Sequence, residues 1–172
     1  YKVEGRDHDT DGWLEVLLRW LERYPIVSIE DPVAEDDANG MRAFTAAAGK
    51  KIQVIGDDFL VTNAQRVRDA AAAGQCNAVL IKPNQAGTVT ETREALEAGR
   101  ALGWGTIVSA RSGESEDVAI SHLATGWNAG QLKVGSFARS ERMAKWNECL
   151  RIEESLGGAA RFAGRAALPV ST

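Results

Sequence analysis

A regular spacing of short apolar segments limits the possible folds of this chain more than any other feature. Five such segments begin near residues 26, 52, 78, 106 and 131, with helical patterns in the intervals between them. Strands that alternate with helices at this spacing form βα units, in which the strands run parallel. We therefore expect an α/β fold built around a parallel sheet.

Two architectures consist of repeated βα units: an open, doubly wound sheet and a (β/α)8 barrel. The dinucleotide-binding form of the open sheet has a Gly-x-Gly-x-x-Gly turn after a strand, and no expected strand is followed by one. A complete barrel takes about 250 residues, whereas this chain has 172 and begins with Tyr1. Five βα units in this length fit a barrel that lacks its first three strands.

Local patterns predict where the helices and strands lie. Four leucines between Leu14 and Leu21 form an apolar stripe at helical spacing, and Asp11 is expected to cap that helix. Capping-box patterns begin at Thr62 and at Thr88. The expected helices are 13–23, 41–48, 62–74, 88–103, 116–124 and 140–156, and the expected strands are 26–30, 52–56, 78–82, 106–109 and 131–134.

Polar side chains stand at the end of every expected strand. In chain order they are Glu30 and Asp31, Asp57 and Asp58, Lys82, then Ser109 with Arg111 and Ser112, and finally Lys133. The carboxyl ends of barrel strands meet at one mouth, where barrel enzymes have their active sites. An ion pair that closes a strand end explains any one of these residues by itself. The full set indicates a functional site at the barrel mouth.

The chemistry of this set points to a metal ion and an anionic substrate. Glu30 and Asp57 offer hard carboxylate oxygens, which suit Mg²⁺. The cations among the set suit the phosphate or carboxylate groups of a small molecule. Removal of a weakly acidic proton beside a carboxylate needs a base, and a bound metal ion stabilises the negative charge that develops. We therefore predict that Lys82 is a catalytic base beside a metal held by Glu30 and Asp57.

Composition excludes other classes of partner. The net charge is −4 and the pI is near 5.3, and no basic stripe stands out, which argues against binding of nucleic acid. No apolar run approaches the roughly 20 residues of a membrane-spanning helix. Cys76 and Cys149 show no metal-type spacing and are expected to be reduced thiols. We expect a cytoplasmic protein without a membrane span.

Six short motifs follow one another along the chain. They are Ser28-Ile29-Glu30-Asp31-Pro32, Gly56-Asp57-Asp58, Lys82-Pro83-Asn84-Gln85, Ser109-x-Arg111-Ser112-Gly113-Glu114, Gln131-x-Lys133 and Arg139-Ser140-Glu141-Arg142. In this order they resemble the C-terminal domain of enolase (phosphopyruvate hydratase), and the resemblance runs from about Tyr24 to Gly164. It implies that residues 1–172 are part of an enolase C-terminal TIM-barrel domain, with the N-terminal domain and the first barrel strands absent.

The resemblance also implies an activity and a role for each residue. The activity is that of a lyase of glycolysis, the Mg²⁺-dependent dehydration of 2-phospho-D-glycerate to phosphoenolpyruvate, in a cytoplasmic homodimer. Enolase-superfamily sites use a Lys or His base beside Mg²⁺. Lys82 matches the base that takes the C2 proton, and Glu30 and Asp57 match two of the three metal carboxylates. Arg111 and Ser112 match the phosphate-binding pair, and Ser109 begins the same substrate loop. Lys133 matches the lysine at the substrate carboxylate.

One departure from the family bears on the substrate. Ala110 stands where the family has a substrate-contacting histidine, and loss of one group that stabilises transition-state charge costs about 2.7–4 kcal/mol. Three interpretations stay open: an enolase, an enolase-like lyase for a related phosphorylated or phosphonate acid, and an enolase-derived binding protein with an impaired site. Nothing in residues 1–23 matches the family's remaining metal ligand or its proton donor, so we expect the isolated chain to be inactive.

Overall fold

Five strands form a parallel sheet in which neighbours in the chain are neighbours in space. The computed structural model describes residues 1–170. The strands are β3 (Ser28–Glu30), β4 (Gln53–Gly56), β5 (Ala78–Ile81), β6 (Gly105–Ser109) and β7 (Gly130–Lys133), and the sheet order is β3-β4-β5-β6-β7. Every neighbouring pair is parallel. A doubly wound sheet reverses its strand order partway across, so the sequential order found here is that of a barrel.

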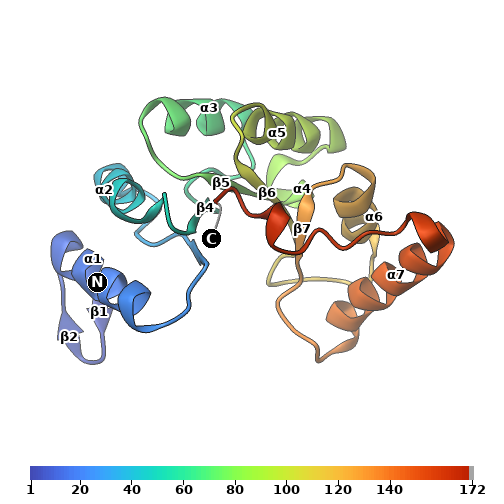
Figure 1. Ribbon diagram of the computed structural model, residues 1–172, viewed down its shortest axis with the longest axis horizontal. Helices are drawn as coiled ribbons and strands as arrows, with labels where there is room; N and C mark the ends of the chain where they lie inside the picture. The colour runs from blue at the N-terminus through green and yellow to red at the C-terminus, as the bar shows by residue number, and fades with distance from the viewer. Residues whose placement is uncertain (171–172) are drawn as a thin grey trace.

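The helices follow one arc, and the strands lie on its inner side (Figure 1). Helix α1 (Thr10–Arg23) precedes the five-stranded sheet, and each strand of this sheet is followed by one helix of two turns or more. These are α2 (Ala38–Ala48), α3 (Ala64–Ala72), α5 (Val89–Ala101), α6 (Ala119–Gly126) and α7 (Ser140–Leu156). Smaller elements are the hairpin of β1 (Lys2–Val3) and β2 (Arg6–Asp7), the short helix α4 (Pro83–Ala86), and the 3-10 turns η1 (Gly157–Ala159) and η2 (Gly164–Ala167).

The two faces of the sheet belong to different layers of the fold. Alternate residues of a strand point to opposite faces. Outward-facing side chains such as Val54 and Val79 pack in one large cluster with helix residues such as Phe44 and Leu96. Inward-facing side chains form a separate buried cluster of Ile55, Ala78, Leu80 and Ile107. This layering, with side chains filling the inner face, is that of a TIM barrel.

Contacts between distant strands show that the sheet is curled. Lys133 on β7 donates to both carboxylate oxygens of Glu30 on β3, at 2.6 Å each. Deeper in the sheet, Gln53 of β4 and Gln131 of β7 exchange hydrogen bonds of 2.8 and 3.1 Å. In a flat sheet β3 and β7 would lie roughly 19 Å apart, at about 4.8 Å per strand. The five strands therefore form a half barrel, as the sequence predicted.

The glutamine pair requires a residue without a side chain at Gly105. A Cβ atom there would lie 2.5 Å from Oε1 of Gln53 and 3.2 Å from Cβ of Ala78. Overpacking of this kind costs about 1–3 kcal/mol. We expect Gly105→Ala to lower the free energy of unfolding by about that amount, measured by urea denaturation. Gly126→Ala is the matched control, because a Cβ at Gly126 meets nothing within 4 Å. Equal stability of the two variants would contradict this account.

Several helix starts differ from the sequence-based prediction. The N-cap of α1 is Asp9, whose side chain accepts from the backbone of Gly12, and not Asp11. The N-cap of α3 is Asn63, because its side chain accepts two backbone N–H groups, while the hydroxyl of Thr62 bonds to Gln85 instead. Thr88 caps α5 as predicted. Helix α6 begins at Ala119 rather than near 116, and the backbone N–H of Ala119 donates to Asp117 just before it.

The part of the chain from residue 1 to residue 170 contains no helix with the length and apolar content needed to cross a membrane.

Candidate active site

The carboxyl ends of the five strands surround one cavity of about 270 Å³. All seven residues predicted from the sequence line it, namely Glu30, Asp57, Lys82, Ser109, Arg111, Ser112 and Lys133. Two further cations in its wall, Arg139 and Arg142, were not predicted as site residues. Their presence in a motif at the start of the last helix was the only available signal. The structure thus brings the whole predicted set together.

The alternation of side chains along the strands explains this convergence. Three site residues each come two positions after a buried residue of the inner face: Asp57 after Ile55, Lys82 after Leu80, and Ser109 after Ile107. Residues two apart in a strand share a face. Glu30 pairs in register with Ile55, and Lys133 pairs with Ser109. All five side chains therefore belong to the inner face of the sheet, toward the carboxyl ends of its strands.

Lys82 and Asp57 form a buried ion pair between neighbouring strands. The ammonium of Lys82 donates to Oδ2 of Asp57, and both side chains are less than a tenth exposed. Gln85 donates to the other oxygen of Asp57 at 3.3 Å. The backbone N–H of Lys82 donates to Thr62 at 3.0 Å, which fixes the strand end. Within residues 1–170, Asp57 is the one protein acceptor for an ammonium that carries three donors.

Glu30 and Lys133 form a more accessible ion pair at the rim. Their side chains are 29% and 42% exposed, respectively. Partly exposed pairs of this kind contribute about 0–1 kcal/mol to stability. A ligand that offers each partner a better counter-charge can therefore separate this pair at little cost to the fold.

Asp57 also belongs to a group of three carboxylates at the edge of the cavity, in which Asp31 has a structural role. Oxygens of Asp31, Asp57 and Asp58 lie within 4.8 Å of one another. Both oxygens of Asp31 accept backbone N–H groups, from Asp57 and from Asp58, at 2.8 Å each. Burial raises the pKa of the Asp31 carboxyl above its ordinary value, and these two hydrogen bonds oppose the rise. Asp31 thus fixes the turn that presents Asp57, and each of its two oxygens already accepts one hydrogen bond.

The donor set of the cavity fits Mg²⁺ in kind. Glu30 and Asp57 supply carboxylates from adjacent strands, and both line the cavity. Mg²⁺ is usually bound by one or two carboxylates together with water and substrate oxygens. In the structure each carboxylate faces a lysine. A divalent cation bound here would compete with Lys82 and Lys133 for those oxygens.

The remaining wall of the cavity is cationic. Its charged residues are Lys82, Arg111, Lys133, Arg139 and Arg142 against Glu30 and Asp57, so five positive charges face two negative ones, a net of +3. A cleft lined mainly by one sign of charge concentrates ligands of the opposite sign. Ser109 and Ala110 add little polarity, because the Ser109 hydroxyl donates to the carbonyl of Ala110. The cavity is suited to an anion with more than one negative charge.

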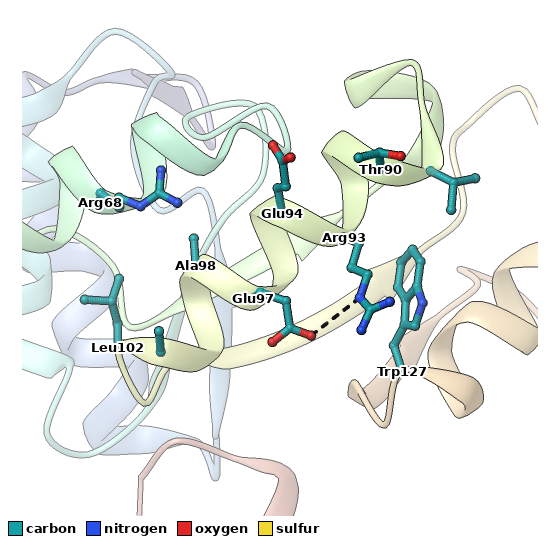
Figure 2. A pocket seen from close by; sticks show the side chains of 10 residues that line it. Arg68, Thr90, Arg93, Glu94, Glu97, Ala98, Leu102 and Trp127 are labelled. Carbon is teal, nitrogen blue, oxygen red and sulfur yellow. Dashed lines mark ion pairs between the residues drawn. The ribbon is translucent and has the colours of Figure 1, made fainter.

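A larger hollow, of about 720 Å³, lies on the outer helices (Figure 2). It follows α5, and Figure 2 shows Arg93 and Glu97 of that helix joined by an ion pair beside Trp127. Its polar residues are exposed helix side chains rather than groups that converge on one point. It shares no residue with the cavity at the strand ends. We therefore place the candidate site at the strand ends.

Comparison with known proteins agrees with the fold and with the order of the motifs. Residues 5–170 match the family described as enolase, C-terminal TIM barrel domain. The chain is 52% identical over 156 residues to Enolase 1 of Methylococcus capsulatus (strain ATCC 33009 / NCIMB 11132 / Bath), in an alignment that covers 91% of this chain and 37% of that protein. The chain thus spans little more than a third of the length of this curated relative. With its curled parallel sheet of five βα units, the chain belongs to the enolase family, as part of the C-terminal TIM-barrel domain.

Proposed function

We propose that this chain is part of a lyase that dehydrates 2-phospho-D-glycerate to phosphoenolpyruvate with Mg²⁺. The observation that carries the proposal is the cavity at the strand ends, where one buried lysine and two carboxylates face a cationic wall. Membership of the enolase family supports it. We further propose that residues 1–172 belong to a longer cytoplasmic homodimer, whose N-terminal domain and first barrel strands complete the site.

Substrate binding follows from the charges of the wall. Arg111 and Ser112 bind the phosphate, for which the planar guanidinium provides a fork of donors. Lys133 leaves Glu30 and binds the substrate carboxylate. Ser109 lies at the base of the same loop and is buried. These contacts place C2 of the substrate toward the third strand end, where Lys82 stands.

Lys82 acts as the base. As a neutral amine it takes the proton from C2, so that a C–H bond breaks, an N–H bond forms and the electron pair moves into the carboxylate group. The ammonium that results is stabilised by Asp57. Mg²⁺ held by Glu30 and Asp57 would stabilise the negative charge that develops on the substrate carboxylate. The C3 hydroxyl then leaves as water with a proton from an acid that we place outside this chain.

The test is formation of phosphoenolpyruvate by the full-length protein, followed by its ultraviolet absorbance. We expect turnover that requires Mg²⁺ and stops when a chelator removes it. The 172-residue chain alone should show none. Turnover by this chain alone would contradict the view that its site is incomplete. Binding of Mg²⁺ without turnover of any phosphorylated acid would favour a binding protein with an impaired site.

One observation favours a second candidate, a lyase for a related phosphorylated or phosphonate acid. Ala110 lines the cavity between Ser109 and Arg111, is only 8% exposed, packs in the large apolar cluster, and stands where the family has a histidine. A methyl group makes no hydrogen bond to substrate. Turnover of such an acid, without turnover of 2-phosphoglycerate, would establish this candidate.

Substitution of Ala110 separates the two candidates. We expect Ala110→His to raise kcat for 2-phosphoglycerate by up to about 10²-fold, because a donor at this point adds transition-state stabilisation. Ala110→Leu is the control, since it fills the same space without a donor, and it should lower kcat. Steady-state kinetics of both variants check the prediction. A fall with both would contradict this prediction, because the added volume beside Arg111 would then outweigh any gain from the donor.

A further inference from the structure

Two buried cations on α7 contact the loops that carry the anion-binding residues. Arg142 is 6% exposed and Lys145 is fully buried. Buried lysine and arginine are rare unless they are paired. Of the two, only Arg142 reaches the cavity wall. Neither is needed for the proton transfer proposed for Lys82, so their burial calls for another explanation.

Arg142 joins the loop after β6 to the loop after β7. Its Nη1 donates to the carbonyl oxygens of Arg111 at 2.8 Å and Val134 at 3.0 Å, and its Nη2 donates to that of Ser112 at 2.9 Å. The guanidinium holds its donors in one rigid plane. A single side chain therefore sets the position of the predicted phosphate-binding pair relative to Val134, the residue after Lys133.

Lys145 acts on the same loop through Glu114. Its ammonium lies 2.9 Å from Oε2 of Glu114 and also donates to the carbonyl of Ser115. The other oxygen of Glu114 accepts the backbone N–H of Arg111 at 2.7 Å. Ser121 of α6 in turn donates to the carbonyl of Lys145 at 3.0 Å. Both backbone polar groups of Arg111 are thus held by side chains, the N–H by Glu114 and the carbonyl by Arg142.

We propose that Glu114, Arg142 and Lys145 form a clamp that positions the loop of residues 109–115 for binding the substrate phosphate. With the backbone of Arg111 fixed on both sides, its guanidinium is aimed at the cavity before substrate arrives. Ordering a loop on binding weakens affinity, and a preformed loop avoids that loss. The three are positioning residues rather than catalytic ones. The nature of the bound anion rests on the proposed function, whereas the clamp itself does not.

The experiment compares Arg142→Lys, Arg142→Gln and Lys145→Met in the full-length protein. Hydrogen–deuterium exchange of residues 109–117 reports the clamp without any need for activity. The effect of the clamp on anion binding is measured by inhibition or calorimetry with inorganic phosphate, together with KM and kcat for 2-phosphoglycerate. Arg93→Gln is the control for loss of a cation, because Arg93 is exposed and its ion pair with Glu97 is long, at 3.9 Å.

We expect exchange in residues 109–117 to rise at least about tenfold in the clamp variants, with a matching loss of phosphate affinity and a higher KM. The kcat should change much less. A variant that is merely destabilised would instead lose active molecules, which lowers the apparent kcat without a change in KM. Arg142→Lys keeps the positive charge but loses the forked donors of the guanidinium. It therefore tests the clamp even if Lys145→Met fails to fold. Unchanged exchange and unchanged phosphate affinity in Arg142→Lys would overturn the clamp. If the wild-type protein binds phosphate but does not turn over 2-phosphoglycerate, the proposed function fails. The clamp is then tested by hydrogen–deuterium exchange and phosphate affinity alone.

Discussion

If Lys82 is the proposed base, Lys82→Met should abolish release of the C2 proton of 2-phosphoglycerate in the full-length protein. We expect kcat to fall by at least about 10²–10⁴-fold, the usual contribution of a positioned general base. The reason is that Lys82 is the cavity cation at the end of the third strand, held by Asp57 alone among the side-chain acceptors that the described residues show. Exchange of the C2 proton with solvent, followed by NMR, measures the step directly.

The interpretation of this variant needs a test of folding. Removal of Lys82 leaves Asp57 buried without its counter-ion, and such a loss costs about 3–5 kcal/mol. Lys82→Arg avoids this problem, because arginine keeps the positive charge but does not release its proton in proteins. It should fold and still fail to exchange the C2 proton. Lys51→Met, on the surface, is the control. Exchange at the wild-type rate in Lys82→Arg would assign the base to another residue.

The site was predictable because its residues obey a local rule. Asp57 and Lys82 each follow a β-strand and Ser109 ends one, at positions that the alternation of side chains places on the inner face. Parallel strands in sequential order then bring those positions to one edge. No knowledge of long-range packing was needed, because each strand end could be recognised from its own apolar segment.

The features that the sequence did not predict depend on contacts between distant segments. Lys145 is fully buried because Glu114, 31 residues earlier, meets it at 2.9 Å. Its burial is invisible in the sequence of α7, where charged residues recur on several sides of the helix. The cap of α3 was misassigned for a similar reason: the Thr62 hydroxyl was available for a cap, but Gln85 and the backbone of Lys82 engage it. The local pattern indicated Thr62 as the cap, and these tertiary contacts leave Asn63 to cap the helix.

Asp57→Asn should weaken Mg²⁺ binding on the order of 10²-fold. A carboxylate beside a cation near a protein surface contributes a few kcal/mol of Coulomb attraction, and the cavity offers only Glu30 and Asp57 as carboxylates among its described lining. Titration calorimetry with Mg²⁺ on the full-length protein measures the loss without reference to turnover. Asp69→Asn, on the exposed face of α3, is the control for the loss of one carboxylate.

Two further variants decide which carboxylates hold the ion with Asp57. If the cavity is the site, Glu30→Gln should weaken Mg²⁺ binding as strongly as Asp57→Asn does, and with little loss of stability because Glu30 is partly exposed. Asp58→Asn should then bind Mg²⁺ as the wild type does. If the ion lies in the neighbouring acidic group instead, Asp58→Asn should match Asp57→Asn and Glu30→Gln should not. The hydrogen bonds that Asp31 accepts favour the first result, because both of its oxygens are turned toward the backbone N–H groups of Asp57 and Asp58.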